Sequence, residues 1–206
     1  MRSLLASPRA WTAGACLDCD RERGKTDLRQ GIGITRQGDA SAMKRVLFVC
    51  SANQLRSPLA EVLFKELVRR RGVTEAWQIG SAGVWALQGS PAAMAAMRAA
   101  AARGLDLSAH IARRVSREML EQSDLVLVME REHLEAIHEE WPALDGRVHL
   151  LSRMAGEAGE VEDPMGLPFE RVRSLGTELE RLLEAGWPRI LQLTQRSAAD
   201  ERGKRP

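Results

Sequence analysis

The chain has 206 residues, of which 44% are hydrophobic and 28% are charged, so it holds enough apolar material for the core of one domain. A formal net charge of +2 gives no reason to expect a nucleic acid partner, and no apolar run reaches the length of a membrane span, so we expect no membrane insertion. Three cysteines make no disulfide framework, and we expect a reducing, cytoplasmic location.

Residues 1–42 are predicted to be a disordered extension, because they hold scattered glycines, many charges and little apolar periodicity. An alternative is that they lie upstream of the true start codon. They lack the apolar core of a secretory signal. Cys16 and Cys19 form a Cys-x-x-Cys pair, but a zinc site usually needs a second pair and a redox pair needs a helix start beside a strand. We therefore expect no metal and no cofactor.

The stretch over residues 46–58 combines a buried strand, a polar loop and the start of a helix. Residues 46–49 are apolar and mostly β-branched or aromatic, and the loop 50–56 follows without a gap. Ser57 and Pro58 have the residue types of an N-cap and a first helical position. Successive backbone N–H groups and the helix dipole at such a junction form an anion site.

Two side chains, Cys50 and Arg56, add chemistry to this anion site, and two others support it. Cys50 lies where the strand ends, and the nearby helix N-terminus and arginine favour its thiolate, a nucleophile toward phosphorus. Arg56 has a planar fork that binds two phosphate oxygens. We expect the Ser57 hydroxyl to hydrogen-bond the sulfur, and Asn53 is a residue type that tolerates the left-handed backbone of a tight loop.

Helices and strands alternate through the remaining sequence, which predicts an α/β fold with a doubly wound, four-stranded parallel sheet and helices on both faces. The folded domain is expected to cover residues 43–194, followed by a polar tail over 195–206. Expected strands include 77–81, 125–129 and 148–151. Expected helices are 58–71, 90–104, a short one capped by Ser116, 131–140, and one from Phe169 that Pro188 should break or kink.

A carboxylate is predicted to reach the same edge of the sheet as the thiol. Asp163 and Pro164 stand in a glycine-rich loop, residues 152–168, that follows the fourth strand. Because sites in parallel sheets lie at the carboxyl ends of the strands, Cys50 and Asp163 are expected to meet there.

The order of these motifs resembles the low-molecular-weight protein-tyrosine phosphatases. Cys-x5-Arg-Ser-Pro after an apolar strand is similar to the signature of that family. Further matching segments, in the family's order, are Ser81-Ala82-Gly83, residues 108–113, residues 123–130 and Asp163-Pro164. The resemblance covers about residues 43–194 and is closest to the bacterial branch that works beside capsule and exopolysaccharide tyrosine kinases.

The resemblance implies a phosphotyrosine phosphatase I-like fold and hydrolysis of phosphotyrosine in proteins through a phosphocysteine. Cys50 would attack phosphorus, Arg56 and the loop amides would stabilise the equatorial oxygens, and Asp163 would act as general acid and then as base. The implied partner is a phosphotyrosine protein, with a tyrosine kinase of polysaccharide export as one candidate. The residues expected to bind substrate are Ser51, Ala52, Asn53, Gln54, Leu55, Ser57 and, as a wall, Trp85.

The chain also departs from the family pattern. Ala52 replaces a usual glycine, and Leu55 replaces a usual second cysteine. Gln54 is neither the aliphatic residue common in tyrosine phosphatases nor the threonine associated with protein-arginine phosphatases. Three alternatives therefore stay open: protein-arginine phosphatase, arsenate reductase with an external thiol, and a phospho-residue-binding module without catalysis. The four histidines have no metal spacing and are expected to be surface or structural residues: His110, His133, His138 and His149.

Overall fold

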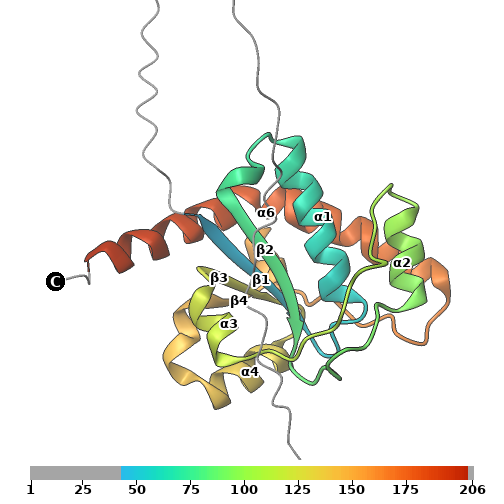
Figure 1. Ribbon diagram of the computed structural model, residues 1–206, viewed down its shortest axis with the longest axis horizontal. Coiled ribbons are helices and arrows are strands. Elements are labelled where there is room, and N and C mark those ends of the chain that lie inside the picture. The colour runs from blue at the N-terminus through green and yellow to red at the C-terminus, as the bar shows by residue number, and fades with distance from the viewer. Residues whose placement is uncertain (1–42, 204–206) are drawn as a thin grey trace, which may run out of the picture. The chain divides into compact units, whose positions relative to one another are not determined.

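The computed structural model describes residues 43–203, and the predictions for residues 1–42, including Cys16 and Cys19, lie outside that range. Four parallel strands form one sheet in the order β2-β1-β3-β4 (Figure 1). Their bounds are Lys44–Cys50 for β1, Trp77–Gly83 for β2, Leu125–Val128 for β3 and Val148–Leu150 for β4. This sheet confirms the predicted α/β fold class.

Helices cover both faces of the sheet. On one face pack α1 (Arg56–Arg70), α2 (Met94–Ala101) and α6 (Phe169–Gly203). On the other face pack α3 (Arg117–Gln122) and α4 (Arg131–Glu140). The short helix α5 (Leu151–Met154) follows β4, and the 3-10 turns η1 (Thr74–Ala76) and η2 (Pro142–Arg147) precede β2 and β4.

The central strand β1 is buried on both sides, which explains its unbroken apolar run. Val46 and Phe48 belong to the core under α1 and α6, whereas Leu47 and Val49 belong to the core under α3 and α4. Side chains alternate between the faces of a strand, so one short stretch of sequence joins both layers of the domain. Its last residue, Cys50, is thereby fixed at the carboxyl edge of the sheet.

The last helix differs from the prediction. Pro188 was expected to break or kink it, but α6 continues through this residue to Gly203. Leu183 and Ile190 on either side are buried in the core, and the Trp187 ring lies 5.3 Å from that of Trp77 between centroids. Packing on both sides of the proline therefore outweighs the hydrogen bond that a proline removes from a helix.

Residues 90–93 also differ from the prediction, since α2 begins at Met94 and not at Ser90. Pro91 pairs with Ile111 in an isolated bridge, and the backbone N–H of Ala93 donates to the Gln54 carbonyl at 2.8 Å. The extended segment thus binds the loop that follows β1, which a helix starting at Ser90 would not do.

The short α3 does begin after the predicted cap: the Ser116 hydroxyl accepts from the Met119 N–H. None of the helices in residues 43–203 combines the length and apolar character of a membrane crossing.

Candidate active site

The loop from Cys50 to Arg56 forms a cradle of backbone N–H groups at the carboxyl end of β1. Asn53 has φ of +54°, the left-handed conformation that turns the chain, as its residue type predicted. Within the described part of the chain, none of the backbone N–H groups of residues 52–56 has a hydrogen-bond acceptor. Because unpaired N–H groups are rarely left so without a ligand, the cradle is built to take an anion.

Strand β2 packs tightly against this cradle. A Cβ atom on Gly83 would lie 2.6 Å from the Ser51 carbonyl oxygen and 2.7 Å from the Asn53 nitrogen, so only glycine fits there. The N–H of Trp85, two residues later, donates to the Ser51 carbonyl at 2.9 Å. The matching segment Ser81-Ala82-Gly83 therefore supports the backbone of the loop.

Asn53 is buried and uses its whole side chain to lock the cradle. Its amide nitrogen donates to the hydroxyls of Ser57 and Ser81, both at 2.9 Å. Its side-chain oxygen accepts from the backbone N–H of Arg113 at 2.9 Å, and its carbonyl accepts from His110 Nε2 at 2.7 Å. His110 therefore braces the loop and does not reach into it. A polar network satisfied in this way is rigid.

The thiol lies on the floor of the cradle. Cys50 is 3% exposed, and its Sγ atom lies 3.1 Å from the Ser57 hydroxyl, the contact expected from the sequence. Ser57 was also predicted to be the N-cap of the following helix, and that was wrong. The helix α1 begins at Arg56, two residues earlier than predicted, and Leu55 occupies the N-cap position without a side-chain cap. The Ser57 hydroxyl instead contacts the sulfur and donates to the Ala82 carbonyl.

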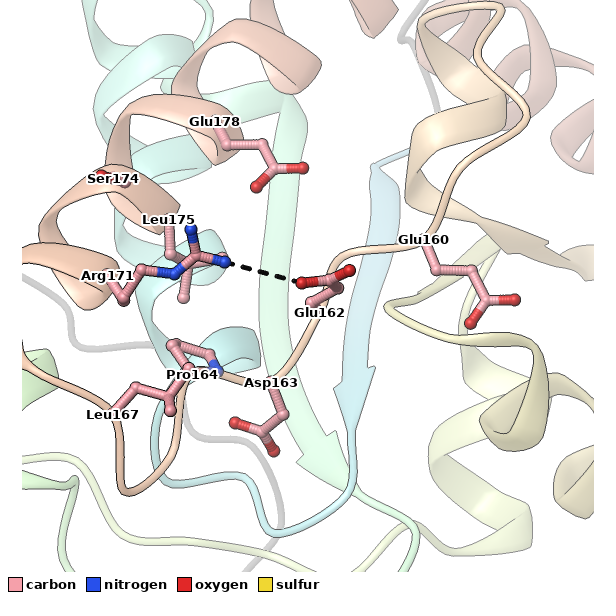
Figure 2. Close-up of a pocket in the computed structure, with 9 residues that line it drawn as sticks. All are labelled: Glu160, Glu162, Asp163, Pro164, Leu167, Arg171, Ser174, Leu175 and Glu178. Carbon is pink, nitrogen blue, oxygen red and sulfur yellow. Dashed lines mark ion pairs between the residues drawn. The ribbon is translucent and has the colours of Figure 1, made fainter.

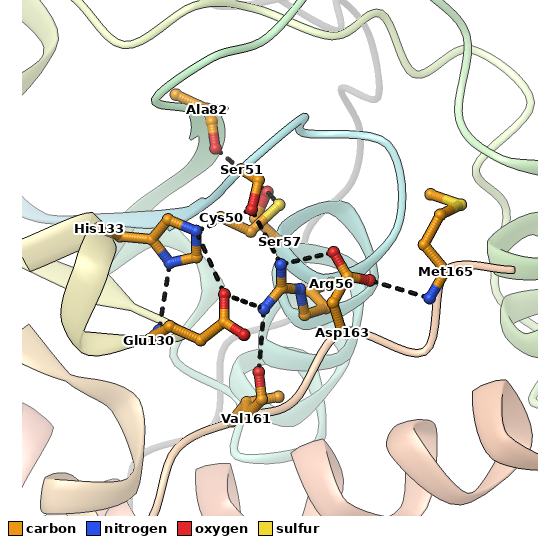
Figure 3. Close-up of polar contacts among 10 residues, drawn as sticks. All are labelled: Cys50, Ser51, Arg56, Ser57, Ala82, Glu130, His133, Val161, Asp163 and Met165. Carbon is orange, nitrogen blue, oxygen red and sulfur yellow. Dashed lines mark hydrogen bonds and ion pairs between the residues drawn. The ribbon is translucent and has the colours of Figure 1, made fainter. Parts of the chain in front are cut away.

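Arg56 is the charged centre of the site and is only 1% exposed. Its Nη1 atom donates to the Val161 carbonyl at 3.0 Å and pairs with Glu130 Oε2 at 2.6 Å. Its Nη2 atom donates to the Ser51 hydroxyl at 3.0 Å and pairs with Asp163 Oδ2 at 2.6 Å (Figure 3). A buried guanidinium needs such partners, because an uncompensated buried charge is strongly destabilising.

Asp163 reaches the thiol-bearing edge of the sheet, as its place after the fourth strand suggested. Its side chain is 37% exposed, and its Oδ1 atom accepts from the N–H of Met165 at 3.0 Å. Behind its loop lies a cavity of about 280 Å³ between the loop and α6, bordered by Arg171 and Glu178. Figure 2 shows the Asp163 carboxylate turned away from these two side chains. The loop that carries Asp163, called the acid-bearing loop below, is therefore held by Arg56 on the side of the cradle and is loosely packed on the side of α6.

Glu130 and His133 belong to the site, although neither was singled out from the sequence for chemistry. His133 was expected at the surface or in a structural role, but it is fully buried beside the cradle. Its Nδ1 atom accepts from the Glu130 N–H at 3.1 Å, and its Nε2 atom lies 2.9 Å from the Ser51 hydroxyl. Burial and the nearby charge of Arg56 lower the pKa of His133 to about 4, so its ring is neutral near pH 7.

The remaining predicted residues line the mouth of the cradle or hold its backbone. Trp85 is 48% exposed, and its ring centroid lies 5.8 Å from that of His133, so it stands beside the site. Leu55 is buried and Ala52 is half-buried, while the Gln54 carbonyl binds the segment before α2. No cluster of three or more potential metal ligands occurs among the described residues.

Comparisons with known proteins agree with this geometry. The family model described as low molecular weight phosphotyrosine protein phosphatase matches residues 45–195. A protein-arginine-phosphatase of Bacillus subtilis is 33% identical over 67% of this chain and 91% of its own length. The low molecular weight protein-tyrosine-phosphatase Wzb of Escherichia coli K12 is 34% identical over 73% of this chain and 97% of its own.

Solved structures agree with the sequence comparisons. The tyrosine phosphatase Wzb from Escherichia coli K30, crystallised with sulphate, aligns with a TM-score of 0.63 and 31% identity, over 73% of this chain and 99% of its own.

Proposed function

Since the chain belongs to the low molecular weight phosphotyrosine protein phosphatase family, we propose that it hydrolyses phosphotyrosine in proteins through a phosphocysteine intermediate on Cys50. The observation that carries this proposal is the cradle itself. The unpaired backbone N–H groups of residues 52–56 follow Cys50 in the same loop, and Arg56 is held at the end of that loop by its hydrogen bond to the Ser51 hydroxyl. Such a set of fixed donors fits the equatorial oxygens of a phosphoryl group.

In the first step the Cys50 thiolate forms a bond to phosphorus while the bond from phosphorus to the phenolic oxygen breaks. The Asp163 carboxylic acid gives its proton to that leaving oxygen, so tyrosine departs neutral. The amides and Arg56 hold the three equatorial oxygens throughout. In the second step Asp163 takes a proton from water, the water oxygen bonds to phosphorus, and the Cys50 thiolate leaves as inorganic phosphate forms.

The ion pair between Arg56 and Asp163 fits this cycle. Without substrate, Asp163 and Glu130 both neutralise the buried guanidinium. A phosphoryl dianion brings its own charge to Arg56, so one carboxylate has to yield. Asp163 is the more exposed of the two, at 37% against 24%, and its loop has an open cavity behind it. Substrate binding would thereby free the Asp163 carboxylate from Arg56, so that it can take up a proton from solvent and give it to the leaving oxygen.

Apolar side chains around the cradle support a protein substrate. Several large hydrophobic residues are exposed on the loops that hydrogen-bond the cradle or carry Asp163, and a bound polypeptide would cover them. An aromatic ring fits this surface better than an alkyl chain, since Trp85 can stack beside it. The exposed residues in question are Trp85, Leu87, Ile111, Met165 and Leu167 on the loops, and Met94 at the start of α2. A cytoplasmic tyrosine kinase of polysaccharide export is the partner that the resemblance described in the sequence analysis suggests.

A second candidate is phosphoarginine in proteins. Glu160, Glu162 and Asp163 lie on the same loop, and although their side chains point apart (Figure 2), their carboxylates give the loop a negative charge that suits a guanidinium leaving group. The similarity to a protein-arginine-phosphatase points the same way. The exposed hydrophobic side chains around the cradle, Trp85 among them, favour phosphotyrosine as the substrate.

A panel of phosphopeptides of one sequence that differ only in the phosphorylated residue tests the proposal. We expect phosphate release from phosphotyrosine, with much slower release from phosphoarginine and phosphoserine, and none with Cys50→Ser. Faster release from phosphoarginine would assign the second candidate. Arsenate reduced with an external thiol, with no peptide hydrolysed, would contradict both. Equal phosphopeptide binding by wild type and Cys50→Ser, with no turnover by either, would indicate a binding module.

A further inference from the structure

The hydroxyl of Ser51 occupies an unusual place among the donors of the site. Its oxygen lies 3.0 Å from Arg56 Nη2 and 2.9 Å from His133 Nε2. Arginine can only donate, so the first contact uses one lone pair of the serine oxygen. The direction of the second contact depends on which ring nitrogen of His133 carries the proton.

The backbone of Glu130 settles the tautomer of His133. Its N–H donates to His133 Nδ1 at 3.1 Å, so in the neutral ring the proton is on Nε2. Glu130 Oε2 lies 3.5 Å from His133 Nε2, whereas the Ser51 oxygen lies 2.9 Å away and is the nearer acceptor. His133 Nε2 therefore donates to Ser51, and both lone pairs of the serine oxygen are occupied. The hydroxyl proton has no acceptor among the residues that the structure describes. It is a donor held ready beside the Cys50 sulfur and Arg56, where an anion is expected (Figure 3).

We propose that the Ser51 side chain donates a hydrogen bond to a phosphoryl oxygen, and that His133 is a positioning residue that fixes the direction of this donor. The inference rests on the phosphatase function proposed above and adds a side-chain donor to the amides of the loop. A free hydroxyl rotates among staggered positions. Because Arg56 and His133 donate to both lone pairs of the Ser51 oxygen, the hydroxyl proton has one direction left, and this donor is oriented before substrate arrives.

His133 also holds the Glu130 backbone through Nδ1, and the test separates this role from the positioning role. His133→Asn keeps an oxygen near the Nδ1 position and removes the Nε2 donor. His133→Gln reaches the Nε2 position and restores a donor to Ser51. His138→Asn is the matched control, because this exposed histidine lies on the same helix α4 outside the site.

Two readouts keep the outcomes distinct. The first is the dissociation constant for inorganic phosphate by calorimetry, which needs no turnover. The second is kcat/KM on a phosphotyrosine peptide. We expect Ser51→Ala to weaken phosphate binding and lower kcat/KM by roughly tenfold to a hundredfold, the range for a hydrogen bond to a charged group. Ser51→Thr keeps the hydroxyl and should stay within about threefold of wild type.

We expect His133→Asn to match Ser51→Ala, His133→Gln to recover most of the loss, and the double variant Ser51→Ala with His133→Asn to lose no more than either alone. If the loss in the double variant equals the product of the two single losses, the inference is wrong. It is also wrong if His133→Asn binds phosphate as tightly as the control His138→Asn. A Ser51→Ala enzyme whose Cys50 alkylation by iodoacetamide shifts in pH dependence would also overturn it, since the hydroxyl would then serve the sulfur. If Ser51→Ala weakens phosphate binding but the wild-type protein hydrolyses no peptide, only the proposed function is contradicted.

Discussion

The two halves of the active site are built in opposite ways. The cradle from Cys50 to Arg56 is largely buried, and Asn53 contributes four hydrogen bonds to side chains and backbone that hold it. The loop that carries Asp163 is partly exposed, backs onto a cavity, and is held to the cradle mainly through Arg56. The cradle is therefore a rigid phosphate-binding loop, whereas the loop that carries Asp163 is loosely held.

This difference follows from what each half has to do. Donors that stabilise a transition state work best when they need no reorganisation, so the cradle gains from rigidity. The acid has to stay near Arg56 while the site is empty and then turn to a leaving oxygen, so its loop gains from freedom. Substitutions in each half should therefore have different effects on phosphate binding, turnover and stability.

The largest expected effect comes from breaking the contact between the halves. Arg56→Lys keeps the positive charge but loses the planar fork that holds Ser51, Val161, Glu130 and Asp163. We expect kcat/KM on a phosphotyrosine peptide to fall by about 10³-fold, the upper range for removing one such donor group. Arg171→Lys in the cavity behind the loop is the control. A loss of less than tenfold in Arg56→Lys would remove Arg56 from the mechanism.

Removing the Asp163 carboxyl group should impair proton donation without impairing phosphate binding by the cradle. Asp163→Asn should lower kcat by roughly 10² to 10³-fold on a phenyl phosphate, whose leaving group needs a proton. On p-nitrophenyl phosphate, a good leaving group, the loss should be much smaller. Phosphate should still bind about as well as in wild type. Equal losses on both substrates would mean that Asp163 is not the proton donor.

Asn53 tests the rigidity of the cradle. Asn53→Ala removes buried hydrogen bonds and places alanine at φ of +54°, so we expect a loss of about 2–4 kcal/mol in the free energy of unfolding. Asn53→Gly loses the same bonds but tolerates the backbone, so it should be less destabilised by about 1 kcal/mol. Urea unfolding of the two variants measures the difference. Identical stabilities would show that the left-handed conformation carries no cost.

His133 gives the smallest effect and a pH dependence. Its folded pKa of about 4 lies below the ordinary value of 6.5, so between these pH values the unfolded chain binds a proton that the folded chain does not. Stability should therefore fall as the pH drops from about 6.5 to about 4, by at most about 3 kcal/mol from this residue. His133→Asn should remove that part of the slope. A variant with an unchanged slope would show that His133 takes up its proton at the same pH in the folded protein as in the unfolded chain.

The sequence was sufficient for the fold class, the nucleophile loop and the edge at which Asp163 meets Cys50. These depend on local patterns and on one rule, that parallel strands end at a common edge. The same rule would have found Glu130, which comes two residues after the end of β3. His133 was missed because its role depends on the neighbours of its two ring nitrogens, which sequence spacing does not show. Pro188 was misjudged because its cost is local, whereas the packing of α6 that offsets it is tertiary.

The same limit applies to Ser57. Its residue type fits an N-cap, but its hydroxyl is drawn to partners on other elements: the Cys50 sulfur, the Asn53 amide and the Ala82 carbonyl. Functional sites are the places where local preference is expected to give way.

Trapping the phosphoenzyme tests the central claim most directly. The protein is mixed with p-nitrophenyl phosphate, quenched in acid within milliseconds, and digested for mass spectrometry. We expect one phosphoryl group on Cys50 in the peptide that holds residues 46–56, formed in a burst before steady turnover. A phosphoryl group on Ser51 or Ser57, or turnover with no label on Cys50 at any time, would contradict it.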